Sequence, residues 1–233
     1  SSSKIVSVHS EDEEILNMRK KLIKEGDVHT HPLWRSDECA ISSTRRIVRI
    51  AERYKKKTHI LHVTTKQEID FLSQHKGNIT FEITPQHLTM YAPDCYDKLG
   101  TYAQMNPPIR NKSHYDRLWY AVKNNLNDTI GSDHAPHLKE NKEKSYPNSP
   151  SGMPGVQTLL PVMLNHVNDK KLSLEQLMNS ICENPVKIFG IKDKGFIKEG
   201  FDADFTIVDM NKKIVIKNEN IESKCGWTPF DGF

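Results

Sequence analysis

Hydrophobic and polar positions along the chain follow two alternating patterns as far as Asp133. Short apolar runs predict buried strands, and stretches with a helical period predict amphipathic helices between them. The strands are expected at residues 4–9, 58–64, 79–84 and 128–132, and the helices at residues 11–25, 37–56, 66–75 and 113–126. Strands that alternate with helices indicate βαβ units, so the fold class is α/β with a parallel sheet.

Four such strands are half of a TIM-type (β/α)8 barrel, which has eight. Beyond Asp133 the pattern changes. Residues 138–151 are polar and are expected to form a loop, whereas residues 154–167 and 174–182 have a helical period. Residues 195–216 are interpreted as short β structure.

Composition excludes several classes of protein. The 33 basic and 30 acidic residues give a net charge of +3, too balanced to predict binding to nucleic acid or to a membrane surface. No apolar run approaches the ~18 residues that a membrane helix needs. Four scattered cysteines indicate reduced thiols in a cytoplasmic protein (Cys39, Cys95, Cys182 and Cys225). The chain opens in a strand without an initiator Met, which we interpret as a portion of a longer protein.

Three chemically useful side chains follow predicted strands. His9, His62 and Asp133 each stand where a strand ends. Because βα loops meet at the carboxyl ends of barrel strands, these residues are expected at one mouth, where two imidazoles and a carboxylate suit a catalytic zinc site. Each also has an ordinary interpretation, since a single His is commonly a surface or core residue and an Asp before a helix is commonly its N-cap.

The segment 131–137, Gly-Ser-Asp-His-Ala-Pro-His, closely resembles the signature of type I-like dihydroorotases, which belong to the amidohydrolase superfamily. Residues 8–12 and 59–65 resemble the metal motifs of the fifth and sixth barrel strands of that family. Further blocks in family order lie at residues 84–88, 105–110, 184–190, 200–204 and 223–232. Together they cover nearly the whole chain.

The resemblance implies a role for each matching residue. His9 and His62 match the histidines that bind the second metal, and Asp133 matches a first-metal ligand that is also the general acid/base. It implies one or two zinc ions as the cofactor. Asn106, His137, Gly152, Pro154 and Gly155 match positions that contact the substrate.

The implied reaction is the reversible hydrolysis of the cyclic amide of dihydroorotate to carbamoyl-aspartate in pyrimidine biosynthesis. The implied fold is the second half of the barrel over residues 1–190. Residues 191–233 would then contribute part of a small C-terminal β-sandwich.

The chain departs from the family pattern in three places. It lacks the first-strand His-x-His pair and the fourth-strand bridging carboxylate, so we expect little turnover by this chain alone. The single His-x-His, His29-Thr30-His31, lies in a loop and is a minor alternative metal site. Gln86 replaces a second His beside His87, which leaves the role of that pair open.

Other functions remain open at this stage. Allantoinase and dihydropyrimidinase share the barrel and its metal chemistry. The chain could instead be a non-catalytic homologue that assembles with a partner such as aspartate transcarbamoylase, or an experimental or proteolytic fragment of an active enzyme. Because a half-barrel has open strand edges, we also expect it to form a homo-oligomer, to associate with the missing half of the barrel, or to rearrange.

Overall fold

A four-stranded parallel sheet organises the chain, as the sequence predicted. The computed structural model describes residues 4–233. The sheet order follows the chain: β1 (Val6–Val8), β2 (Thr58–Ile60), β3 (Ile79–Ile83) and β4 (Thr129–Ile130). In the register, Ile60 pairs with Val8 on one side and with Phe81 on the other. All four carboxyl ends therefore lie along one edge of the sheet.

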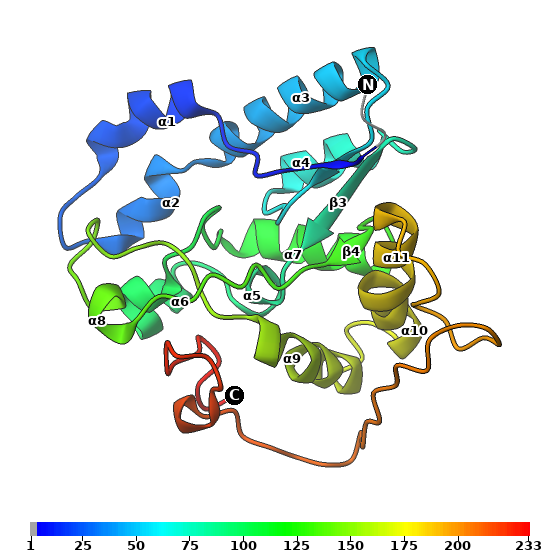
Figure 1. Cartoon of the computed structure of the whole chain (residues 1–233). Coiled ribbons are helices and arrows are strands. Elements are labelled where there is room, and N and C mark those ends of the chain that lie inside the picture. The colour runs from blue at the N-terminus through cyan, green and yellow to red at the C-terminus, as the bar shows by residue number, and fades with distance from the viewer. Residues whose placement is uncertain (1–3) are drawn as a thin grey trace.

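Helices connect the strands and surround the sheet (Figure 1). They are α1 (Glu13–Arg19), α2 (His31–Trp34), α3 (Asp37–Arg53), α4 (Lys66–Leu72), α5 (Pro85–Thr89), α6 (Asp94–Leu99), α7 (Lys112–Lys123), α8 (Lys139–Lys142), α9 (Val156–Asn168), α10 (Leu174–Met178) and α11 (Asn184–Phe189). Short 3-10 turns lie at Lys20–Leu22, Val28–Thr30, Gly100–Ala103 and Asn218–Asn220, and a π-helical turn at Asn179–Glu183 joins α10 to α11.

Side-chain caps determine where the site-bearing loops end. The Asp12 carboxylate accepts from the backbone N–H of Glu14 and Ile15, which starts α1 soon after β1. Thr65 and Glu68 form a reciprocal capping box that starts α4 soon after β2. The loops that carry His9 and His62 are consequently short and have defined ends.

Two apolar clusters support these elements. The larger cluster packs α3, α4 and α7 against the sheet, with Ile60, Phe81 and Ile83 fully buried. The smaller cluster joins loops from distant parts of the sequence, and its largest members are Tyr96, Met105, Tyr146, Met153 and Trp227. Trp227 also donates from Nε1 to the backbone oxygen of His137 at 2.7 Å, so the C-terminal segment packs on the loops after β3 and β4.

Three local expectations were wrong. The loop expected at His29-Thr30-His31 contains a 3-10 turn and the start of α2, and the expected loop at residues 138–151 contains α8. Residues 195–216, expected to be β structure, contain no strand. Figure 1 shows them as an extended trace that runs from beyond α11 to the C-terminal segment, away from the sheet. Their alternating pattern has the composition of a strand, but a strand also needs a neighbour with which to pair.

None of the helices in residues 4–233 combines the length and the apolar character needed to cross a membrane.

Candidate active site

His9 and His62 meet at the carboxyl edge of the sheet. His9 follows β1 and His62 lies two residues beyond the end of β2. His9 Nδ1 lies 3.0 Å from His62 Nε2, and the two rings pack edge to face with centroids 4.7 Å apart. The sequence predicted this convergence from two strand ends that are 53 residues apart.

The pair fits a zinc ion. Two nitrogens 3.0 Å apart can both lie about 2.1 Å from one ion. The other nitrogen of His9 is hydrogen-bonded to Glu11 Oε2 at 2.9 Å, an outer carboxylate of the kind that accompanies metal-binding histidines. Burial lowers the pKa of His62 to about 4, which keeps the ring neutral and able to ligate at pH 7.

Asp133 lies after β4 in the same region. Its pKa is raised to about 6, first by burial and then by the negative charge of Glu82, while the charge of His9 acts in the opposite direction. Among residues 4–233, no group of three His, Cys, Asp or Glu side chains comes close enough to hold a metal ion. The structure therefore brings His9 and His62 together and leaves Asp133 as a neighbour of the pair.

His62 and Asp133 have strained backbone conformations. His62 has φ +34° and Asp133 has φ +43°, in the left-handed region that non-glycine residues seldom adopt. Such strain costs on the order of 1–3 kcal/mol, and it persists where the surrounding structure requires it, commonly at functional sites.

Sequence reasoning missed an acidic residue inside the site. Glu82 Oε1 accepts from the backbone N–H of His62 at 3.3 Å, and Glu82 Oε2 lies 3.5 Å from His59 Nε2. A Cβ atom at Gly131 would lie 2.4 Å from Glu82 Oε2, so Gly131 leaves the space that the carboxylate occupies. The inward direction of alternate β3 residues could have indicated Glu82.

Asn106 and His137 hold defined positions on the loops. Asn106 Oδ1 lies 3.1 Å from His31 Nε2, which also lies 3.0 Å from the backbone oxygen of Met105. His137 Nε2 lies 3.1 Å from the backbone oxygen of Ser151. These two of the five residues predicted to contact the substrate are thus each hydrogen-bonded to another segment of the chain.

Gly152, Pro154 and Gly155 form a tight connection into α9. A Cβ atom at Gly152 would lie 2.8 Å from Ala135 Cβ, and one at Gly155 would lie 2.4 Å from the backbone oxygen of Ser132. The Gly155 N–H donates to His134 Nδ1 at 3.1 Å. The loop is therefore packed directly against the residues on both sides of Asp133.

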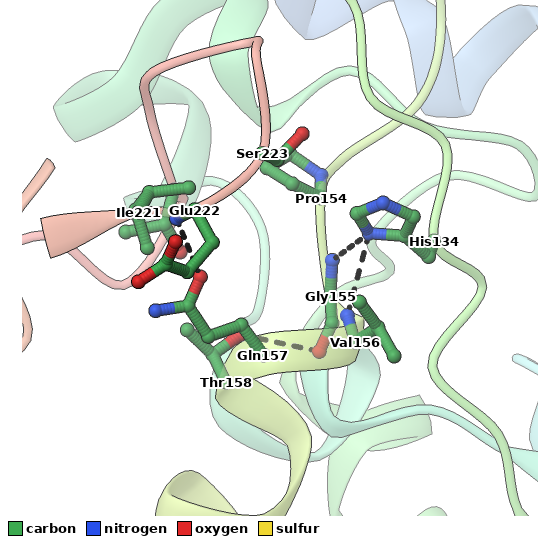
Figure 2. Close-up of a pocket in the computed structure, with 10 residues that line it drawn as sticks. His134, Pro154, Gly155, Val156, Gln157, Thr158, Ile221, Glu222 and Ser223 are labelled. Atoms are coloured by element: carbon green, nitrogen blue, oxygen red, sulfur yellow. Dashed lines mark hydrogen bonds between the residues drawn. The ribbon is translucent and has the colours of Figure 1, made fainter.

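A cavity of about 350 Å³ opens beside this loop (Figure 2). It is lined by the start of α9 and the C-terminal segment, with His134, Pro154, Gly155, Gln157, Ile221 and Glu222 among the lining residues. Pro154 and Gly155 contribute to it, whereas His9, His62 and Asp133 do not line it.

The alternative His-x-His metal site does not form. His29 is exposed and lies 3.3 Å from Asp97, whereas His31 is buried against Met105 and Asn106. Gln86 and His87 each contact a backbone oxygen of another segment. Gln86 Nε2 donates to the backbone oxygen of Ser132 at 3.0 Å, and His87 Nε2 lies 3.1 Å from the backbone oxygen of Pro107.

The comparisons with known proteins agree with this arrangement. The chain belongs to the amidohydrolase family, whose profile matches residues 2–228. It is 35% identical over 238 residues to the dihydroorotase of Methanosphaera stadtmanae, covering 98% of this chain and 54% of that protein. It is 36% identical over 230 residues to the dihydroorotase of Pyrococcus abyssi, covering 98% and 52%. The chain thus spans about half the length of these relatives.

Solved structures of cyclic amidases share the fold. The L-hydantoinase of Arthrobacter aurescens superposes with a TM-score of 0.94 at 30% identity, covering 99% of this chain and 53% of that one. The dihydropyrimidinase of Brevibacillus agri superposes with a TM-score of 0.90 at 26% identity, covering 98% and 53%. The expected half of a TIM-type barrel is confirmed, and the β-sandwich portion is not.

Proposed function

We propose that this chain carries part of the active site of a zinc-dependent dihydroorotase, which reversibly hydrolyses dihydroorotate to carbamoyl-aspartate in pyrimidine biosynthesis in the cytoplasm. The observation that carries the proposal is the 3.0 Å approach of His9 Nδ1 to His62 Nε2 at two strand ends. The dihydroorotases among the relatives support this choice of substrate.

His9 and His62 would hold the second zinc ion of the site, and Asp133 would be a ligand of the first. A bound zinc ion supplies Lewis-acid polarisation and the activation of water at neutral pH. Asp133 would accept a proton from the attacking water on its carboxylate and pass it to the departing amide nitrogen. In the metal-free chain burial raises the pKa of this carboxyl group to about 6, so it is mostly ionised at pH 7 and can accept a proton.

The substrate would lie against the loops that follow β3 and β4. Asn106 would contact the pyrimidine ring and His137 the substrate carboxylate. The backbone at Gly152, Pro154 and Gly155 would lie against the ring. The close packing of Gly152 and Gly155 on their neighbours supports this role, because it holds the loop backbone in one position.

Two measurements on the purified chain test the proposal. Zinc affinity is measured by competition with a chromophoric chelator for the parent chain and for His62→Ala, and we expect the variant to bind at least about tenfold more weakly. Ring opening is followed by ultraviolet absorbance with added zinc and dihydroorotate, dihydrouracil, hydantoin or allantoin. We expect weak turnover, highest with dihydroorotate. Equal zinc binding by parent and variant would contradict the proposal, and faster turnover of hydantoin would assign the substrate to the hydantoinase class.

A second candidate is a non-catalytic homologue that contributes to an assembly, for example with aspartate transcarbamoylase. The observation that favours it is that residues 4–233 contain no group of three potential metal ligands. Zinc binding without ring opening of any of these amides would support this function over hydrolysis.

A further inference from the structure

Glu11 lies beside His9 but has no part in the reaction as proposed above. We propose that Glu11, held by Arg35, is a positioning residue that fixes the His9 tautomer, with the proton on Nε2 and Nδ1 left unprotonated toward His62. The inference rests on the proposed function, because it concerns how His9 is prepared to bind a metal ion.

The contact with Glu11 determines which nitrogen of His9 carries the proton. Glu11 Oε2 lies 2.9 Å from His9 Nε2. An ionised carboxylate is only an acceptor, so the nitrogen that faces it must carry the proton. A neutral imidazole carries one proton, and Nδ1 therefore keeps its lone pair directed at the point where it meets His62.

Arg35 keeps the Glu11 carboxylate ionised and in place. Its side chain is 1% exposed, and Arg35 donates to it from Nη2 at 2.6 Å and from Nε at 3.0 Å. This paired geometry defines the direction of the carboxylate as well as its charge. The Arg35 guanidinium also lies 5.0 Å from the ring centroid of Trp34, which restricts its movement.

A third contact links this pair to the other histidine. Arg110 is buried and donates from Nη1 to the backbone oxygen of Arg35 and from Nε to Thr64 Oγ1 at 3.2 Å. Thr64 is two residues beyond His62. One buried guanidinium thus contacts both the segment that holds Glu11 and the segment that carries His62, so the two imidazoles are held relative to one another.

A purely structural ion pair would stabilise the fold without affecting the tautomer. Glu11→Gln separates the two roles, because an amide is nearly the same size but can present its NH₂ group to His9 Nε2. The proton of His9 can then move to Nδ1, where it blocks metal binding. Glu11→Asp keeps the acceptor and serves as the conservative variant.

The test reads the tautomer directly by ¹⁵N NMR of the histidine side chains in the metal-free chain at pH 8. We expect the Nε2-protonated signal for His9 in the parent chain and in Glu11→Asp, and a substantial Nδ1-protonated population in Glu11→Gln. Circular dichroism verifies that each variant is folded. Zn²⁺ affinity, measured by chelator competition, is expected to fall about 10- to 100-fold in Glu11→Gln.

Asp97→Asn is the matched control, since it removes a carboxylate that lies 3.3 Å from the exposed His29 outside the site. It should change neither the His9 signal nor the Zn²⁺ affinity. An unchanged His9 tautomer in folded Glu11→Gln would overturn the inference. This readout needs neither zinc nor turnover, so it remains decisive even where the proposed hydrolysis fails. If Glu11→Gln does not fold, the parent chain decides, because an Nδ1-protonated His9 beside the intact Glu11 carboxylate would overturn the inference.

Discussion

His31 holds the side chain of Asn106. His31 Nε2 lies 3.1 Å from Asn106 Oδ1 and 3.0 Å from the backbone oxygen of Met105. Because both neighbours are acceptors, Nε2 carries the proton and donates to both. A buried residue from α2 thus orients a residue that is proposed to contact the substrate ring.

Removal of the His31 hydrogen bonds should lower the stability of the fold. His31→Leu leaves two acceptors without their donor in a buried site, and we expect a loss of about 2–3 kcal/mol in the free energy of unfolding. Urea denaturation followed by circular dichroism measures it. His29→Leu, two residues away and exposed, should change stability by less than about 0.5 kcal/mol. Equal losses in the two variants would contradict the assigned role of His31.

Buried histidines make stability depend on pH. Burial lowers the pKa to about 4 for His31, His62, His114 and His166, and to about 3 for His87. The unfolded chain takes up these protons near pH 6.5 and the folded chain does not, so stability falls as pH decreases from about 6.5 to about 4. For His31 alone the shift corresponds to about 3 kcal/mol.

Asp133 acts in the opposite direction over part of this range. Its raised pKa means that the folded state keeps a proton that the unfolded state has released between pH 4 and 6. Five histidines outweigh the three carboxyl groups whose pKa values burial raises, which are Asp133, Glu68 and Asp128, so the urea midpoint should be clearly lower at pH 5 than at pH 7. The same midpoint at both values would refute the prediction.

Lys142 gives a second pH effect, on the alkaline side. The side chain is fully buried, and Nζ donates to the backbone oxygens of Gln104 and Pro150 at 3.0 and 2.8 Å. Burial lowers its pKa to about 7, so the folded state releases a proton that the unfolded state keeps to about 10.5. Stability should therefore rise from pH 7 to pH 9. Lys142→Met should abolish this rise in urea titrations, whereas Lys144→Met should retain it.

Gly152 should not tolerate a side chain. It has φ +142°, and a Cβ atom would lie 2.8 Å from Ala135 Cβ. We expect Gly152→Ala to cost about 2–3 kcal/mol and to speed tryptic cleavage in the 138–151 segment. Gly190→Ala is the control, because Gly190 has φ +66° with open space around it and should cost only about 1 kcal/mol. A smaller effect at position 152 than at 190 would contradict this account.

The open sheet edges and the exposed apolar side chains predict self-association. Within residues 4–233, β1 and β4 each pair on one side only, and Ile197 and Ile207 are 89% and 98% exposed. Light scattering should give a mass above that of the 26.8 kDa monomer. The double variant Ile197→Lys with Ile207→Lys should shift the mass toward the monomer. A monodisperse monomer that binds no hydrophobic dye would argue against this prediction.

The amino-acid sequence by itself determined the four strands, their parallel order and the position of His9, His62 and Asp133 after three of them. These features depend on hydrophobic periods within single elements and on short motifs, which are local properties of the chain. The sequence also predicted that His9 and His62 approach one another, because the carboxyl ends of parallel strands share one edge.

Only the tertiary structure decided the contacts that orient these residues. Three contacts each join segments that are 24 to 75 residues apart in the sequence: Glu11 with Arg35, His31 with Asn106, and Gly131 against Glu82. Residues 195–216 illustrate the same limit of sequence-based prediction. Their pattern indicates a preference for extended backbone, but a strand forms only where a neighbouring strand is present to pair with it. The hydrophobic period of the sequence predicts which face of an element is buried, whereas only tertiary packing determines which side chains come into contact there.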